Sequence, residues 1–339
     1  MSPRLDRRAA VAIGLMALLA ILPLVATWLD QGFYVGQLRR VLIFAIAAVS
    51  LDIILGYGGM VSLGHAAFVG AGAYVVALLH WHADRGIEIL GLLPGTMQSL
   101  ATIPAAMLVA ALLALAIGAI SLRTSGLYFI MITLAFAQLV YFLFVSLRFE
   151  DAGRSYGGDD GLRYPADVAV LGIVETTNDL GFYFVVWTVL ALVLVAAQRL
   201  VRSRFGVVLQ GIRDNERRMR AIGFPTNRYR LVAFVLSGAI AGLAGALLAL
   251  HEGYVSPSLM HWTRSGDLVV MVVLGGMGTL FGPVIGATLF LLLEKFLPDF
   301  TEHWMIVFGP LLVLAVLFAR RGLIGLFDKR GEEARDGGH

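Results

Sequence analysis

The sequence contains no cysteine among its 339 residues. Disulfide bonds and metal sites built on thiolates are therefore excluded. Lysine is also nearly absent, because only Lys295 and Lys329 of the 26 basic residues are lysines, and neither follows the glycine spacing of a phosphate-binding loop. Such a loop needs its lysine to reach the β- and γ-phosphates of a nucleotide. The chain therefore has no ATP-hydrolysing site of the usual kind, and we expect no bound cofactor.

Charged residues are scarce as well. They make up 14% of the sequence, against about 25% in an average soluble domain, whereas hydrophobic residues make up 59% and the mean hydropathy is +0.84. The net charge of +3 is too small to indicate a nucleic-acid ligand. Much of the protein surface must therefore face something other than water.

Long apolar runs account for this composition, since a helix crosses a bilayer with about 20 apolar residues. The expected full spans are 9–29, 37–55, 61–80, 100–121, 126–148, 180–199, 231–250, 283–297 and 303–319. A shorter run at 267–281 is interrupted by glycine. These runs lack the alternation of apolar and polar residues seen in barrel strands. The sequence predicts an all-α, polytopic transmembrane helix bundle, with one transmembrane domain over residues 1–330.

Basic residues orient this bundle, because cytoplasmic loops collect lysine and arginine. Three arginines within the first eight residues place the N-terminus inside, and nine arginines place the stretch 199–230 inside. The loop 149–179 is acidic and is expected outside. The C-terminal segment is basic near the membrane and also lies inside, followed by a polar tail at 331–339 that we expect to be disordered. Two inside termini require an even number of crossings, so 267–281 is expected to cross as a tenth span; a re-entrant segment is the alternative.

Within the arginine-rich stretch, an apolar stripe indicates a helix outside the bilayer. Phe205, Val208, Leu209 and Ile212 follow the i, i+3, i+4, i+7 spacing of an amphipathic helix. Gly223 and the proline two residues later predict its end. Such a helix lies on anionic lipid headgroups or docks into a protein partner.

Two glycine-rich segments predict interrupted helices. Gly58 and Gly59 make a poor helix interior, and Ser62 is a suitable N-cap for a new helix near Leu63. The sequence GGMGTL at 275–280, which contains Gly275 and Gly276, is similar to GGMVSL at 58–63. Interrupted helices point to a transport pathway, where unwound backbone and helix N-termini meet a polar substrate. In contrast, the glycines of 237–249 favour close packing of helices.

A few polar residues lie at membrane depth. For His65 two interpretations stay open, a structural hydrogen bond or a place in the transport pathway. We expect Asp52 to cap a helix or pair within the bundle, and Thr133 and Gln138 to be able to hydrogen-bond across helices. Gln138 is also a candidate residue of the transport pathway, together with Ser62 and the glycines of the two interruptions. No second histidine or carboxylate stands at metal-ligand spacing, so no metal is expected.

Several motifs resemble those of a known family. The segment RDNERRMRAIGFP resembles the coupling loop of ABC importer permeases, with Glu216 and Gly223 at the family spacing, although Arg217 and Arg218 replace the usual small residues. The assigned loop residues are Arg213, Asp214, Asn215, Glu216, Ala221 and Gly223. Five further motifs resemble the LivM-type permease of branched-chain amino acid importers: LGYGGMVSLGHAAFVGAGAY (55–74), LRTSGLYFIMITLAFAQ (122–138), YGGDDGL (156–162), SGAIAGLAGALLA (237–249) and VVLGGMGTLFGPVIGA (272–287).

This resemblance implies a permease subunit in a bacterial inner membrane, with both termini cytoplasmic. Its implied partners are a LivH-like second permease, two cytoplasmic ATPase subunits that use ATP, and a periplasmic substrate-binding protein. The implied substrates are branched-chain or other hydrophobic amino acids; urea or short amides are the alternative within the family. A different class, an ion-coupled secondary transporter, would use Asp52, His65 or Asp267 as its coupling site. A membrane-embedded enzyme would need a nucleophile or metal cluster at membrane depth, and the sequence offers neither.

Overall fold

The computed structural model describes residues 3–28, 32–89, 93–151, 154–165, 168–170, 174–300, 306 and 309–310. The expected span 303–319, apart from three of its residues, and the tail 331–339 lie outside the described residues. The helices are α1 (Pro3–Trp28), α2 (Gly32–Leu55), α3 (His65–Arg85), α4 (Ser99–Ser121), α5 (Leu127–Ser146), α6 (Asp179–Arg202), α7 (Arg204–Ala221), α8 (Thr226–Glu252), α9 (Trp262–Gly275) and α10 (Gly282–Phe300). The expected all-α fold is confirmed.

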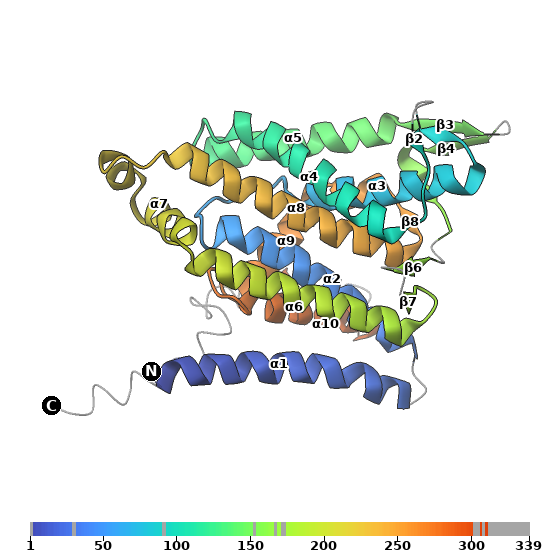
Figure 1. Ribbon diagram of the computed structural model, residues 1–339, viewed down its shortest axis with the longest axis horizontal. Helices are drawn as coiled ribbons and strands as arrows, with labels where there is room; N and C mark the ends of the chain where they lie inside the picture. Colours follow the sequence, from blue (N-terminus) through green and yellow to red (C-terminus); the bar gives the residue numbers. More distant parts are fainter. Residues whose placement is uncertain are drawn as a thin grey trace.

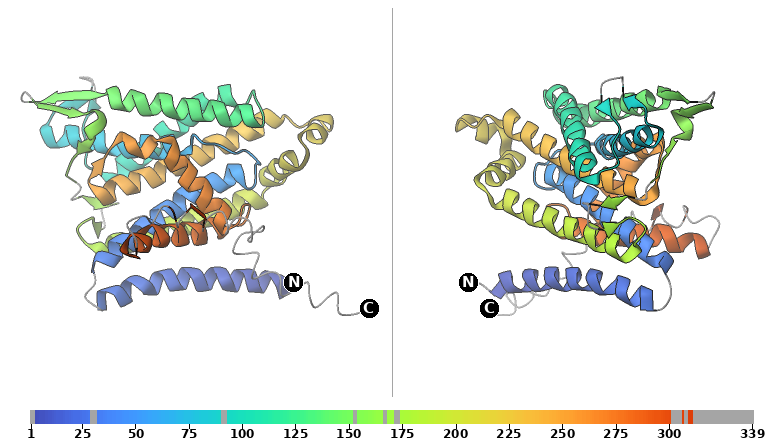
Figure 2. Two further views of the ribbon diagram at one scale, coloured as in Figure 1. Left: turned by 180° about the vertical axis from the view of Figure 1, so that it is seen from behind. Right: turned by 45° about the vertical axis from the view of Figure 1, so that its right-hand side comes forward.

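The helices other than α7 run roughly along one direction and form a bundle (Figure 1). Helix α7 lies at one end, and we call this the α7 end; short strands gather at the opposite end, the loop end (Figures 1 and 2). Helix α1 lies at the edge of the bundle, where the hydroxyl of Tyr183 in α6 donates a hydrogen bond to the carbonyl oxygen of Leu19. The middle of the arginine-rich stretch 199–230 forms α7, whereas its two ends belong to α6 and α8.

Five helices, α3, α4, α5, α6 and α8, are long and apolar enough to cross a membrane. These helices differ in how much of their apolar surface is buried inside the protein. In α3, 78% of the apolar window is buried inside the protein, but in α5 only 22% is buried. An apolar helix that is mostly unburied needs lipid or a protein partner around it. Helix α3 therefore belongs to the centre of the bundle and α5 to its periphery.

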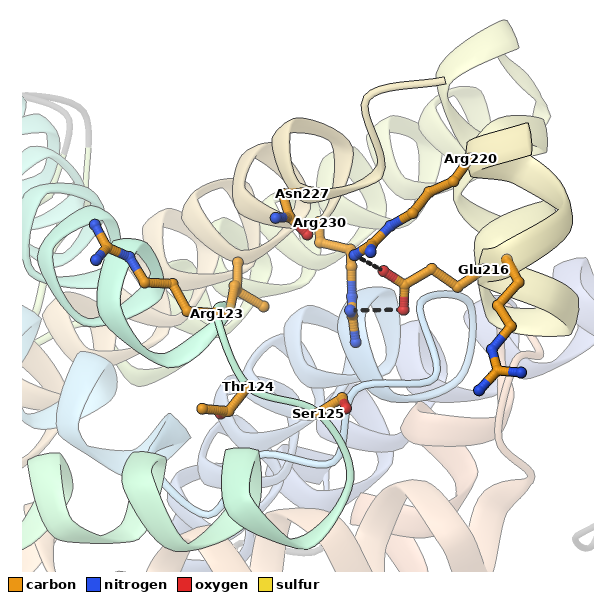
Figure 3. A pocket seen from close by; sticks show the side chains of 9 residues that line it. Arg123, Thr124, Ser125, Glu216, Arg220, Asn227 and Arg230 are labelled. Atoms are coloured by element: carbon orange, nitrogen blue, oxygen red, sulfur yellow. Dashed lines mark hydrogen bonds and ion pairs between the residues drawn. The ribbon is translucent and has the colours of Figure 1, made fainter. Parts of the chain in front are cut away.

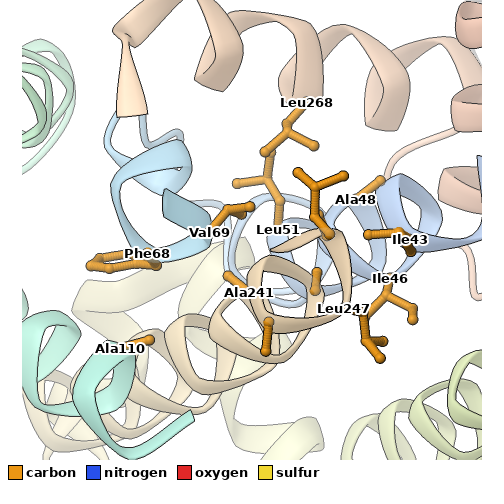
Figure 4. Close-up of a cluster of buried hydrophobic side chains, with 14 of the residues drawn as sticks. Ile43, Ile46, Ala48, Leu51, Phe68, Val69, Ala110, Ala241, Leu247 and Leu268 are labelled. Carbon is orange, nitrogen blue, oxygen red and sulfur yellow. The ribbon is translucent and has the colours of Figure 1, made fainter. Parts of the chain in front are cut away.

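The centre of the bundle is formed by α2, α3 and α8, with α4 and α9 beside them (Figure 4). The glycines of α8 make close contacts there. A Cβ added at Gly238 would overlap Ala114 of α4, and one added at Gly245 would overlap the carbonyl oxygen of Val69 in α3. Helices in lipid associate chiefly through such close approaches of small residues. The prediction that these glycines serve packing is confirmed.

The connections at the loop end contain short antiparallel strand pairs. The pairs are β1 (Glu88–Ile89) with β2 (Leu93–Pro94), β3 (Arg148–Asp151) with β4 (Arg154–Gly157), β5 (Leu162–Arg163) with β8 (Tyr254–Val255), and β6 (Ala169–Val170) with β7 (Val174–Glu175). The 3₁₀ helices are η1 (Gly158–Asp160) and η2 (Pro257–Met260). In η1 and its flanks, Gly157, Gly158 and Gly161 have positive φ of 84°, 65° and 72°, so the YGGDDGL motif is a tight turn.

The segment that contains α9 passes from one end of the bundle to the other. Val255 pairs with Leu162 in the β5–β8 pair at the loop end, whereas Gly278 lies against Gly56 at the α7 end. This path favours the crossing over the re-entrant alternative. Only 14 residues of the path are helical in α9, about 21 Å of rise, so the helix is shorter than the roughly 30 Å hydrocarbon core.

Candidate functional site

The first interruption separates α2 from α3. Helix α2 ends at Leu55 and α3 begins only at His65, so the intervening chain enters the bundle without helical structure. The prediction of a broken helix is confirmed, but Ser62 does not cap the new helix. Its hydroxyl oxygen accepts a hydrogen bond from the N–H of Gly64 at 3.2 Å, and Gly64 is the N-cap residue, without a side-chain cap. A Cβ at Gly64 would lie 2.8 Å from the carbonyl oxygen of Thr133, so the chain needs glycine there to pass α5.

Side chains from two other helices satisfy the backbone where α3 begins. The N–H of Leu63 donates to the hydroxyl of Thr133 in α5 at 3.3 Å, and the N–H of Ala66 donates to the hydroxyl of Ser265 in α9 at 2.9 Å. The first N–H groups of a helix have no partner within the helix itself. Helices α5 and α9 therefore hold the start of α3 inside the bundle. The expected hydrogen-bonding role of Thr133 is confirmed, and Ser265 was not expected.

His65 is fully buried and joins three helices. Its Nε2 lies 2.8 Å from the hydroxyl of Ser50 in α2, and the Ser50 carbonyl accepts a hydrogen bond from Ser237 in α8. The ring also meets Phe68 edge to face, with centroids 5.7 Å apart. These contacts agree with the interpretation in which His65 makes a structural hydrogen bond. A place for His65 in the transport pathway stays a prediction.

The second interruption separates α9, which ends at Gly275, from α10, which begins at Gly282. A Cβ at Gly275 would overlap the carbonyl oxygen of Gly282, so the two helices meet backbone to backbone. In the intervening turn Gly276 has φ 119° and Gly278 has φ 70°. Gly59, which corresponds to Gly276 in the GGM sequence, also has a positive φ, 66°. Both breaks thus use glycine at the same place in the motif.

The two interruptions meet at the α7 end. The Oδ1 atom of Asp52, in the last turn of α2, accepts a hydrogen bond from the N–H of Gly278 at 2.8 Å. Asp52 is 2% exposed, so this carboxylate is removed from bulk water. The expectation that Asp52 pairs within the bundle is confirmed, and its partner is the backbone of the other break.

Helix α7 contacts this meeting point through Arg213. Its Nη1 donates to the carbonyl oxygen of Gly56 at 2.7 Å, and the arginine stem lies against Gly59, where a Cβ would be 2.7 Å from the Arg213 Cγ. We call Asp52, Gly56, Gly278 and Arg213 the junction. The junction joins α7 to both interruptions.

Helix α7 is not continuous, contrary to the single helix expected. Leu209 and Ile212 are buried as the apolar stripe predicts, but Asn215 has non-helical angles of φ −158° and ψ 94°. The Asn215 side-chain oxygen accepts a hydrogen bond from the N–H of Arg218 at 3.0 Å, which is N-cap geometry. A second short helical piece therefore starts after Asn215 and ends at Ala221.

The second piece of α7 is fixed by ion pairs of Glu216. Its carboxylate lies 2.6 Å from Arg220 and 3.1 Å from Arg230 in α8. Asp214 is more exposed and pairs with its neighbour Arg213 at 3.1 Å. Gly223 has φ 92°, so the predicted glycine stop after the helix is confirmed.

The predicted pathway residues do not form one cluster. Ser62 and His65 lie where α3 begins; Gly59 contacts Arg213; Gly275 and Gly276 lie at the turn between α9 and α10. Gly58 packs on its own chain, where a Cβ would lie 2.7 Å from the carbonyl oxygen of Ile54. Gln138 in α5 is half-buried, and its side-chain nitrogen has no hydrogen-bond partner among the described residues. Within that part of the chain, no three His, Asp or Glu side chains group so as to hold a metal ion.

Comparison with known proteins places this chain in a family. Residues 33–316 match the family model described as the permease component of branched-chain amino acid transport systems. The high-affinity branched-chain amino acid permease protein LivM of Escherichia coli K12 is 28% identical over 337 residues, which cover 91% of this chain and 74% of LivM. A probable LivM of Methanocaldococcus jannaschii is 24% identical, with coverage of 83% and 90%.

A shorter similarity exists to the LivH permease protein of Escherichia coli K12, with 28% identity over 144 residues, 42% of this chain and 46% of LivH. No solved structure matches the chain. The family match begins in α2 and extends past α10, so it includes both helix interruptions, the junction and α7. The chain belongs to the family of branched-chain amino acid transport permease components.

Proposed function

We propose that this chain forms part of the membrane passage of an ATP-driven importer for branched-chain or other hydrophobic amino acids. ATP is hydrolysed by separate subunits, and their movement reaches the passage through α7. The observation that carries this proposal is the junction, in which Arg213 contacts the first interruption and Asp52 links it to the second. The relatives LivM and LivH, named for high-affinity branched-chain amino acid transport, support the substrate class.

The exposed side of α7 is the proposed docking surface for an ATPase subunit. Leu209 and Ile212 face the bundle and are buried, but Val207 and Ile222 are 64% and 63% exposed. Exposed apolar side chains beside charged ones are typical of a surface that another protein covers. The coupling residues Arg213, Asp214, Asn215, Glu216, Ala221 and Gly223 belong to this segment.

The remaining assembly follows from orientation and family. The α7 end faces the cytoplasm because it carries the arginine-rich stretch, and α1 begins at the same end. The loop end then faces the periplasm, where a substrate-binding protein delivers the amino acid. A LivH-like subunit completes the passage, and two ATPase subunits dock at the cytoplasmic face of the bacterial inner membrane. The chain itself binds no cofactor.

The test is uptake of labelled leucine by proteoliposomes. The complete complex with ATP is expected to accumulate leucine, and the purified single chain is expected to transport nothing. Uptake by the single chain under a proton or sodium gradient would instead establish an ion-coupled secondary transporter. Competition by unlabelled urea, acetamide and branched-chain amino acids, in the presence of the binding protein, separates the two substrate classes.

A further inference from the structure

A pocket opens at the α7 end between three segments of the chain (Figure 3). Its volume is about 300 Å³. The connection between α4 and α5 forms one side, the second piece of α7 forms another, and the start of α8 closes the third. The lining residues are Leu122, Arg123, Thr124, Ser125, Glu216, Arg217, Arg220, Asn227 and Arg230.

The pocket has an excess of positive charge. Four arginines and one glutamate line it. Glu216 is already shared between Arg220 and Arg230, and Figure 3 shows its carboxylate turned toward both. Arg123, whose side chain points away from Glu216 in Figure 3, and Arg217 have no acidic partner within the part of the chain that the structure describes. The pocket therefore has unused capacity for an anion.

The pocket also offers uncharged donors. Ser125 and Asn227 line it. Phosphate oxygens accept hydrogen bonds from guanidinium, hydroxyl and amide groups together. This combination of donors fits a phosphate group better than a single carboxylate, which offers fewer oxygens.

The surroundings of the pocket are apolar and unburied. Ile120 at the end of α4 is 52% exposed, and Leu127 and Tyr128 at the start of α5 are 76% and 73% exposed. Tyrosine is enriched where membrane helices meet the headgroup region. A molecule with a phosphate in the pocket could therefore lay an apolar chain along α4 and α5.

We propose that this pocket binds the phosphate of an anionic phospholipid in the leaflet at the α7 end. Basic pockets between membrane helices on the cytoplasmic side are suited to such headgroups. The bound lipid bridges the α4–α5 connection and the second piece of α7, and so steadies the segment that Glu216 ties to α8. This site is independent of the proposed transport function, since it needs only the chain and a membrane.

The experiment uses the purified full chain in nanodiscs of phosphatidylcholine with phosphatidylglycerol, and counts retained phosphatidylglycerol by native mass spectrometry. The pocket variant is Arg123→Gln with Arg217→Gln. The matched control is Arg218→Gln with Arg228→Gln, which removes the same charge from exposed arginines outside the pocket. The amount of phosphatidylglycerol retained by the pocket variant is expected to be roughly tenfold lower than in the wild type. The reason is that each basic side chain near an anionic surface contributes severalfold to binding. The control is expected to keep it.

Three outcomes would overturn the proposal. Equal loss in both variants would show diffuse attraction rather than a site. Release of the lipid by millimolar inorganic phosphate, with phosphate protecting Arg123 and Arg217 from an arginine-modifying reagent in detergent, would identify a free-anion site instead. Unchanged lipid in the pocket variant, together with lost capture of the ATPase subunit, would assign the pocket to the subunit interface. Thermal unfolding of both variants checks that the fold is retained.

Discussion

The carboxylate of Asp52 accepts a hydrogen bond from the backbone N–H of Gly278, which is 226 residues away along the chain. This one contact joins the end of α2 to the turn between α9 and α10. Because the carboxylate is buried, its loss leaves a backbone group without a partner in a region of low polarity.

Asp52→Leu removes the acceptor, and Asp52→Asn keeps an oxygen in the same position. Leaving a buried donor unsatisfied costs about 1–3 kcal/mol, which corresponds to a roughly 5- to 150-fold change in an equilibrium. We expect Asp52→Leu to lower the unfolding temperature of the purified chain and to reduce leucine uptake by the complex. Asp52→Asn is expected to retain most of both.

The matched control is Asp84→Leu, because Asp84 lies at the loop end of α3, where its side chain is 42% exposed and contacts its neighbour Arg85. Its stability and uptake are expected to stay close to those of the wild type. Equal behaviour of Asp52→Leu and Asp84→Leu would show that the junction does not hold the two interruptions together.

Arg213→Ala removes the contact between α7 and Gly56. The second variant, Arg218→Ala, removes an exposed arginine of the same segment that has no contact with the junction. In the complete complex we expect Arg213→Ala to hydrolyse ATP but to lose leucine uptake about tenfold or more, the size of an allosteric coupling of 1–3 kcal/mol. Arg218→Ala is expected to keep both activities. A parallel fall of hydrolysis and uptake in Arg213→Ala would point to lost docking instead of lost transmission.

Glu216→Arg places a positive charge beside Arg220 and Arg230, which now share the carboxylate at 2.6 and 3.1 Å. Like charges at this distance repel, so the second piece of α7 is expected to separate from α8. We expect ATP hydrolysis to continue while leucine uptake falls, and protease cleavage within 216–230 to become faster. Glu216→Gln keeps the shape without the charge and is expected to give an intermediate uptake. Normal coupling in Glu216→Arg would count against a role of this piece in transmission.

Gly245→Ala and Gly266→Ala test the packing of the bundle. A Cβ at Gly245 would overlap the Val69 carbonyl and lie 2.9 Å from the Ala73 nitrogen, whereas one at Gly266 meets nothing within 4 Å. Overpacking typically costs about 1–3 kcal/mol, and alanine in an open helix position gains roughly 0.5–1 kcal/mol. Thermal unfolding in detergent is expected to show a lower midpoint for Gly245→Ala and an equal or higher one for Gly266→Ala. The same midpoint for both would mean that α3 and α8 are less close than the structure indicates.

The membrane helices could largely be predicted, because long apolar runs leave few alternatives in a bilayer. Their boundaries were less accurate, and α9, which ends at Gly275 instead of 281, is one example. The expected run began at 267, but the helix begins at Trp262 and includes Arg264, which forms an ion pair with Asp267 at 3.4 Å. A prediction from hydropathy alone places the boundary of a span at charged residues such as these.

The interruptions could be predicted from glycine, but their details could not. Ser62 has N-cap chemistry, yet the chain stays non-helical until Gly64, where it passes close to Thr133 of α5. Asn215 did carry a signal, since asparagine favours caps over helix interiors, but the apolar stripe of α7 concealed it. The contact of Asp52 with Gly278 has no local sequence pattern at all, because it depends on how distant helices pack.

Arg213 contacts the connection between α2 and α3, and Asp52 links α2 to the turn between α9 and α10. A displacement of α7 that moves α2 and α3 is therefore transmitted to α9 and α10 as well. We therefore expect the four helices to move together, because displacing one pair alone would first break the hydrogen bond between Asp52 and Gly278. That requirement favours an all-or-none motion with few stable intermediates.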